Sequence, residues 1–93
     1  MNDPNVSVVV TTYNRRNLLQ KTINSILKQT YYNFELIIVD NYSNYNIIEF
    51  IKSLDDDRVK LFQNNNNGII SVNRNFGVQK SNSDYIAFCD DDD

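Results

Sequence analysis

Hydrophobic and polar positions along the chain divide it into short apolar runs and longer amphipathic segments. Residues 6–12 (VSVVVTT) and 34–40 (FELIIVD) are continuously apolar over strand length, which is typical of strands buried on both faces of a parallel sheet. Residues 59–63 (VKLFQ) alternate, so they predict a half-exposed strand near a sheet edge. Residues 84–89 (DYIAFC) predict a fourth strand, which we expect to be central and buried.

Three segments between these runs have helical spacing. Residues 13–30 carry one apolar stripe, with Asn14 placed to act as an N-cap. Residues 47–54 carry a second stripe, and residues 69–80 predict a third helix, which Gly77 weakens in its last turn. The order β-α-β-α-β-α-β predicts an α/β fold, a Rossmann-like parallel sheet with helices on both faces. The stripe residues are Leu18, Leu19, Ile23, Ile26 and Leu27 in the first helix and Ile47, Ile48, Ile51 and Leu54 in the second.

Composition excludes several classes of function. The chain has 93 residues, enough for one small domain, and its net charge of −3 disfavours binding to nucleic acid or anionic lipid. It contains no histidine, which excludes histidine-based triads and metal ligands. A single cysteine excludes an internal disulfide and suits a reducing, cytoplasmic compartment. No apolar run approaches the roughly 20 residues that span a bilayer.

Polar residues follow three of the predicted strands. In open α/β sheets, ligands bind beyond the carboxyl ends of the strands, where strand order reverses. The first strand ends in residues 11–14 (TTYN), the second at Asp40, and the fourth runs into four aspartates, residues 90–93. Parallel strands would bring these groups to one rim. Taken singly, each has an ordinary alternative: strand residues with a helix cap, a turn cap, or a solvated acidic tail.

The aspartate run is the strongest indication of a site. Carboxylates that follow a buried strand repel one another, and a divalent cation removes that repulsion. Ligation by oxygen alone suits Mg²⁺ or Mn²⁺. The chain has neither G-x-G-x-x-G nor G-x-x-x-x-G-K-[ST], so a dinucleotide fingerprint and a P-loop are unsupported.

Other candidate residues are less specific. Arg74 is either a solvent-facing helix arginine or a guanidinium that reaches phosphate or base. We expect Cys89 to be a small buried core thiol. Four tyrosines are expected to cover loops, with stacking on a base or sugar as the alternative: Tyr31, Tyr32, Tyr42 and Tyr45.

Four ordered motifs carry a resemblance to a known family. They are V-T-x-Y-N at residues 10–14, F-E-L-I-I-V-D at 34–40 with "QT" shortly before it, R-N-x-G at 74–77, and D-x-D-D at 90–93. Together they resemble the N-terminal half of family-2 inverting glycosyltransferases with the GT-A fold. The likeness covers essentially the whole chain. It implies that residues 1–93 are the nucleotide-sugar donor part of a glycosyltransferase domain, ending at the D-x-D motif.

The resemblance implies roles for residues near the nucleoside. Thr11 and Tyr13 match the start of the pocket for base and ribose, and Asp40 matches the aspartate that hydrogen-bonds uracil or nucleoside. Arg74 matches the helix arginine near the nucleotide. The family commonly has D-D-G-S after the second strand. Here residues 40–43 are D-N-Y-S, so an acid and a glycine are lost and base contacts are expected to differ.

The D-x-D motif implies the metal site. Asp90 and Asp92 match its two acids, and Asp92 resembles the direct ligand of the Mn²⁺ or Mg²⁺ that the diphosphate binds. Asp90 or Asp91 would contact the ribose or the metal, and Asp93 matches a trailing acid. The catalytic base and the acceptor-binding half are expected beyond Asp93, so no residue of this chain is assigned as catalytic.

The implied reaction is inverting transfer of a sugar from a nucleotide-diphospho-sugar, with UDP expected, to an acceptor hydroxyl. A saccharide or lipid-linked acceptor and a role in cell-surface polysaccharide or glycan synthesis are expected, in the cytoplasm or at the inner face of a membrane. A partial domain would expose apolar surface and favour homo-oligomers. The alternatives are a non-catalytic nucleotide and metal module, and a receiver-type Mg²⁺-binding α/β domain.

Overall fold

A computed structural model of the chain describes residues 5–29, 33–64 and 70–90. Strands and helices alternate strictly along these residues, which confirms the predicted β-α-β-α-β-α-β order. Each helix follows a strand, as a parallel sheet requires. The elements are β1 (Val6–Thr12), α1 (Arg16–Leu27), β2 (Phe34–Asp40), α2 (Ile47–Ser53), β3 (Val59–Gln63), α3 (Ile70–Gln79) and β4 (Tyr85–Asp90).

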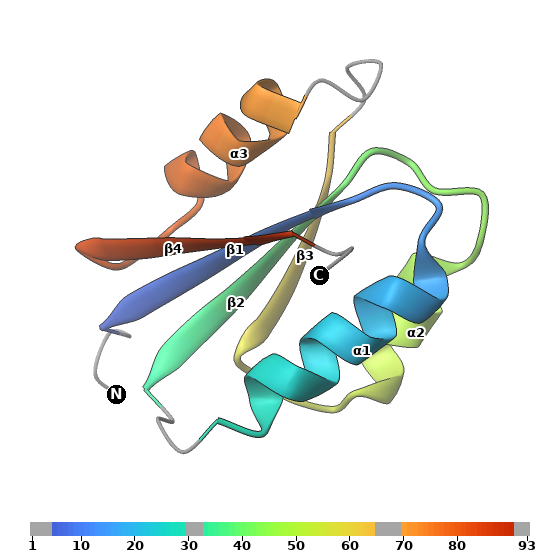
Figure 1. Ribbon diagram of the computed structural model, residues 1–93, viewed down its shortest axis with the longest axis horizontal. Coiled ribbons are helices and arrows are strands. Elements are labelled where there is room, and N and C mark those ends of the chain that lie inside the picture. The colour runs from blue at the N-terminus through green and yellow to red at the C-terminus, as the bar shows by residue number, and fades with distance from the viewer. Residues whose placement is uncertain (1–4, 30–32, 65–69, 91–93) are drawn as a thin grey trace.

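The described strands form one parallel sheet with the order β3-β2-β1-β4. Helices α1 and α2 cover one face, and α3 covers the other (Figure 1). After β3 the chain crosses back over the sheet and adds β4 beside β1. Strand order therefore reverses between β1 and β4, and the carboxyl ends of these two strands form the switch point at which such sheets bind ligands.

Strand β2 is buried along its whole length, because β1 and β3 flank it and helices cover both its faces. Successive residues of a strand point to opposite faces, and the core accordingly divides into two clusters. Leu36 and Ile38 pack on the α1 and α2 side, whereas Ile37 and Val39 pack on the α3 side. The continuous apolar pattern of residues 34–40 correctly predicted this burial.

Strand β4 differs from its prediction. It was expected to be central and buried, but in the described sheet it lies at the edge, next to β1 alone. Tyr85 is 72% exposed and Phe88 49% exposed. Cys89, expected in the core, is only partly buried against the α1 and α2 side. The apolar composition of β4 predicted a strand but not its position, because strand order depends on long-range pairing.

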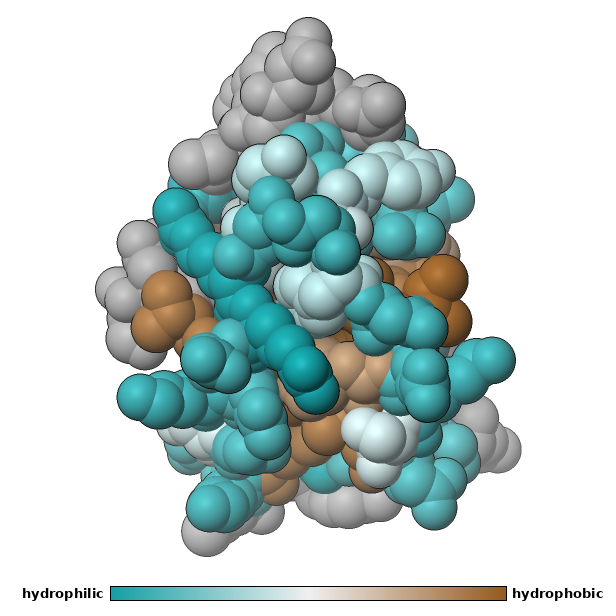
Figure 2. Space-filling view, turned by 90° about the vertical axis from the view of Figure 1, so that its right-hand side faces the viewer, coloured by the Kyte–Doolittle hydropathy of each residue, from teal (hydrophilic) through white to brown (hydrophobic). Residues whose placement is uncertain are grey.

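The apolar stripes of α1 and α2 are wider than the surfaces they bury. Leu18 and Ile48 belong to the predicted stripes, yet both are exposed. Leu19, Ile23 and Ile47 make the buried contacts with the sheet. Figure 2 shows this side of the molecule, where hydrophilic side chains cover most of the surface and apolar ones appear in smaller areas between them.

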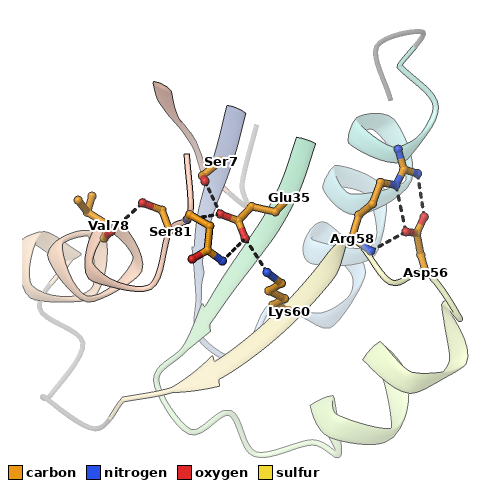
Figure 3. Close-up of polar contacts among 8 residues, drawn as sticks. Ser7, Glu35, Asp56, Arg58, Lys60, Val78 and Ser81 are labelled. Atoms are coloured by element: carbon orange, nitrogen blue, oxygen red, sulfur yellow. Dashed lines mark hydrogen bonds and ion pairs between the residues drawn. The ribbon is translucent and has the colours of Figure 1, made fainter. Parts of the chain in front are cut away.

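A buried carboxylate joins four segments near the amino ends of the strands. Glu35 accepts hydrogen bonds from Ser7 Oγ on β1, from Lys60 Nζ on β3 at 2.7 Å, and from the backbone N–H of Asn82 at 2.6 Å (Figure 3). Burial raises the pKa of Glu35, but the hydrogen bonds from Lys60, Ser7 and Asn82 outweigh it, so the pKa lies below its usual value. This network fixes the connection between α3 and β4 to the sheet.

A second ion pair fixes the turn before β3. The guanidinium of Arg58 donates to both carboxylate oxygens of Asp56, at 3.0 and 2.8 Å (Figure 3). The same guanidinium stacks 4.5 Å from the ring centre of Phe34 at the start of β2. The aspartate-rich break predicted by residues 55–58 is therefore an ordered turn held against the sheet.

Candidate functional site

The carboxyl ends of β1 and β2 continue together past the sheet. Thr12 and Asp40 are register partners, and the backbone N–H of Asn41 donates to the carbonyl of Thr12 at 3.1 Å. The loops that follow these two strands therefore begin side by side. This confirms the expectation that the polar residues after the first and second strands share one rim.

Asp40 organises the loop that follows β2. Its side chain is fully buried, and its two oxygens accept hydrogen bonds from the backbone N–H of Ser43 at 3.0 Å and from Ser43 Oγ. Gln63 at the end of β3 donates to the same carboxylate at 3.2 Å. The structure thus gives Asp40 a role in holding the rim. Its expected hydrogen bond to a nucleoside stays a prediction.

Asn14 joins the two loops, and its prediction as a helix cap is wrong. Helix α1 has Arg15 at the N-cap position, with no side-chain cap hydrogen bond. The backbone N–H of Asn14 instead donates to Ser43 Oγ at 2.8 Å, and its Oδ1 accepts from the backbone N–H of Asn44 at 2.6 Å. Its φ of 52° is left-handed, a conformation that asparagine adopts more readily than most residues. The side chain that could cap α1 is therefore used to link the loops.

Two exposed tyrosines precede the residues of this link. Tyr13, before Asn14, is 51% exposed, and Tyr42, before Ser43, is 55% exposed. Tyr42 has a φ of 57°, in the left-handed region that a bulky residue rarely adopts. Sequence reasoning expected Tyr42 to cover a loop, with stacking on a base or sugar as the alternative. The aspartate-to-serine spacing of D-N-Y-S was the available signal, because it is typical of a turn closed by an aspartate side chain.

The end of β4, where the diphosphate is expected to bind, lies at the switch point. Thr11 on β1 is the register partner of Asp90, the last residue of β4. Asp91 and Asp92 lie outside the described residues, as does Asp93. Over the residues that the structure does describe, no group of three or more acidic, cysteine or histidine side chains could hold a metal ion. The predicted Mn²⁺ or Mg²⁺ ligands therefore stay predictions, with Asp90 at a suitable strand end.

Arg74 extends from α3 to β4. Its guanidinium lies over the ring of Phe88, 5.5 Å from the ring centre, and Phe88 precedes Asp90 by two positions on β4. The arginine is half-buried rather than freely solvated. This half-buried position disfavours the solvent-facing alternative, and a contact of Arg74 with phosphate or base stays a prediction.

Comparison with known proteins decides the family. The family model described as "Glycosyl transferase family 2" matches residues 7–93. The chain belongs to glycosyltransferase family 2. This membership excludes the receiver-type alternative and confirms the resemblance that the motifs carried.

Similar proteins are longer than this family-2 chain. A GalNAc(5)-diNAcBac-PP-undecaprenol β-1,3-glucosyltransferase from Campylobacter jejuni is 38% identical, and the match covers 97% of this chain but 30% of that protein. The chain spans well under half the length of the first curated relatives it matches, between 14% and 38%. The activity of the whole protein is therefore treated below as a proposal.

Solved structures support the GT-A fold of this family-2 chain. S. aureus TarS (residues 1–349) in complex with UDP-GlcNAc superposes with a TM-score of 0.85 and 26% identity, over 95% of this chain and 26% of that one. A Pyrobaculum calidifontis mannosyltransferase in complex with GDP-Man and Mn²⁺ gives a TM-score of 0.81 at 21% identity, over 99% of this chain and 28% of that one. The second likeness supports the fold alone.

None of the helices in residues 5–29, 33–64 and 70–90 is long and apolar enough to cross a membrane.

Proposed function

We propose that residues 1–93 are the donor-binding part of a glycosyltransferase that takes a UDP-sugar and transfers its sugar with inversion to an acceptor hydroxyl. The observation that carries the proposal is the pairing of Thr11 with Asp90 at the point where strand order reverses. The likeness to TarS in complex with UDP-GlcNAc supports UDP-sugar as the donor. The name of the Campylobacter relative supports a lipid-linked acceptor, and with it glycan synthesis at the inner face of a membrane.

Different residues of the rim would contact different parts of the donor. Thr11 and Tyr13 would line the base and ribose, with Asp40 holding the loop that faces them and Arg74 near the phosphates. Asp92 and Asp90 would hold Mn²⁺ or Mg²⁺, because carboxylate oxygens suit these ions, and Asp91 would contact the ribose or the metal. When bound, the metal would neutralise charge on the leaving diphosphate.

The chemical step needs one more group. Deprotonation of the acceptor hydroxyl requires a general base, and carboxylates commonly fill this role. None of the 93 residues is assigned to it, and the relatives are longer, so the base would come from residues outside this chain. We therefore expect the 93-residue chain to bind donor weakly and to transfer no sugar by itself.

Calorimetric titration tests this function. The chain is titrated with UDP in the presence of Mn²⁺, Mg²⁺ or EDTA, and we expect weak binding that requires the metal. Asp92→Asn should weaken metal-dependent binding about tenfold or more, because a neutral amide replaces the charged carboxylate that would ligate the metal. Asp57→Asn, which removes an exposed acid from the turn between α2 and β3, is the matched control and should leave binding unchanged.

The results of the titration distinguish a donor site from a non-specific charge effect. Absence of UDP binding under every metal condition would contradict the proposal. Equal weakening by Asp57→Asn would indicate a general loss of negative charge rather than a site. If a longer version of the protein binds UDP-sugar but never transfers the sugar, the protein is a non-catalytic binding module and not a transferase.

A further inference from the structure

The backbone of Tyr42 adopts a conformation that favours glycine. Its φ is 57°, and a bulky side chain in the left-handed region costs free energy relative to glycine. The hydrogen bonds between Asp40 and Ser43 impose this geometry, because both the backbone N–H and the hydroxyl of Ser43 donate to the same carboxylate. The loop therefore carries a tyrosine where glycine would be the less strained residue.

Contacts among the described residues do not explain this tyrosine. The side chain is 55% exposed. In the part of the chain that the structure describes, no hydrogen bond, ion pair or ring contact involves it. A strained backbone that holds an exposed aromatic side chain is typical of a ligand contact.

The link between the loops places Tyr42 close to Tyr13 in the fold. Asn14 follows Tyr13, Ser43 follows Tyr42, and the backbone N–H of Asn14 donates to Ser43 Oγ at 2.8 Å. Both tyrosines are about half exposed. Two exposed aromatic residues thus leave the ends of β1 and β2 at one rim.

The order of the strands indicates which part of a donor lies there. Asp90 ends β4, which neighbours β1, and β2 lies on the other side of β1. Neighbouring strands are about 4.8 Å apart, so the end of β2 lies roughly 10 Å from the end of β4. If the acidic end of β4 takes the diphosphate, the nucleoside extends across β1 toward β2.

We propose that Tyr42 stacks on the nucleobase of the donor and, with Tyr13, increases affinity for the nucleoside end. This inference rests on the proposed donor function. Aromatic rings stack on the π-face of any base, so Tyr42 would strengthen nucleoside binding without selecting one base by hydrogen bonding. Tyr42 stands at the position of the glycine in the family's D-D-G-S pattern, and it would here be an additional base contact.

The test compares a ligand with a base and a ligand without one. UDP and inorganic pyrophosphate, each with Mn²⁺, are titrated into the wild-type chain, Tyr42→Gly, Tyr42→Phe and Tyr85→Ala. We expect Tyr42→Gly to weaken UDP binding about tenfold and to leave pyrophosphate binding unchanged. Tyr42→Phe should keep the affinity for UDP. Tyr85→Ala removes another exposed tyrosine, at the opposite end of the sheet, and should change the binding of neither ligand.

Thermal unfolding of the same variants separates binding from folding. Tyr42→Gly should unfold at the same temperature as the wild type or higher, because it relieves the left-handed strain. Unchanged UDP affinity in Tyr42→Gly, with binding intact in the wild type, overturns the inference and leaves the donor function standing. Equal loss of UDP and pyrophosphate binding overturns it as well. A wild-type chain that binds neither ligand removes both the donor function and this inference.

Discussion

Glu35 shows how one buried polar residue organises distant segments. It is nearly inaccessible to solvent, yet its carboxylate is satisfied by Ser7, Lys60 and the backbone of Asn82. A buried carboxylate without such partners would be costly, so the network depends on all of its donors. Because Asn82 lies just before β4, this network connects the central strands to the strand that ends at Asp90.

The pH dependence of stability follows from this residue. The pKa of Glu35 is lowered in the folded state, so the folded chain keeps the carboxylate charged where the unfolded chain takes up a proton. The contribution of Glu35 is complete above its usual pKa of 4.5 and is lost as pH falls through the lowered folded value. Urea unfolding between pH 7 and pH 3 should show Glu35→Gln less stable by about 2–3 kcal/mol at neutral pH. The difference should shrink toward pH 3.

The control for this experiment is Asp57→Asn. Asp57 is exposed, so its replacement should leave the free energy of unfolding within about 0.5 kcal/mol of wild type. A Glu35→Gln variant that is as stable as the wild type at neutral pH would show that the network makes no net contribution to the free energy of unfolding.

At the scale of elements, α3 approaches the sheet more closely than its sequence indicates. Gly77 was expected only to weaken the last turn of the helix, yet α3 continues to Gln79 and Gly77 is buried against β1 and β2. A Cβ atom at this position would lie 2.5 Å from Cγ1 of Val9 and 3.4 Å from Cγ2 of Val39. Glycine is therefore required here by packing rather than by backbone conformation.

Gly77→Ala should destabilise the chain, although alanine is the better helix former. Helix propensity favours alanine by about 1 kcal/mol, but overpacking against Val9 costs about 1–3 kcal/mol, and we expect the packing cost to exceed the gain. Urea unfolding measures the difference. Asn75→Ala, at an exposed position of the same helix, is the control and should be neutral or slightly stabilising.

A double variant isolates the contact. In a Val9→Ala background, Gly77→Ala should cost less than it does in the wild type, because the clashing methyl groups are absent. Equal costs in the two backgrounds would place the source of the destabilisation elsewhere.

Local patterns predicted the elements, and long-range contacts decided the rest. The apolar runs at residues 6–12 and 34–40 identified β1 and β2 with their bounds, because the local sequence pattern of each segment already indicates a buried strand. The edge position of β4 and the exposure of Ile48 were missed, since both depend on which elements become neighbours. The role of Asn14 was missed for the same reason, because its partners lie about 30 positions away along the chain.

At the scale of the whole molecule, β4 forms an exposed apolar edge of the described sheet. The outer side of β4 has no neighbouring strand in the described sheet, and Tyr85, Ala87 and Phe88 are exposed along it. An exposed apolar edge strand is a template for pairing with another chain. The opposite edge strand, β3, is half-buried throughout and carries Lys60, which makes it less suited to such pairing.

We therefore expect the 93-residue chain to self-associate through β4. Sedimentation velocity over a range of concentrations should show the mean mass rising with concentration in the wild type. Tyr85→Lys should shift the chain toward monomer, because a charge on an edge strand opposes pairing. Ile48→Lys, which adds the same charge at an exposed apolar position of α2, should not. A monomeric wild type, or equal effects of both variants, would contradict the prediction.

The pairing of β1 with β4 also sets an order of events during synthesis. β1 ends at Thr12, whereas its partner on this side begins only at Tyr85. At translation rates of about 5–20 residues per second, roughly 4–15 s pass between the emergence of the two strands. During that interval β1 can pair with β2 alone, and its other edge stays open. Among the four described strands, the switch point between β1 and β4 is therefore the last part that a growing chain can close.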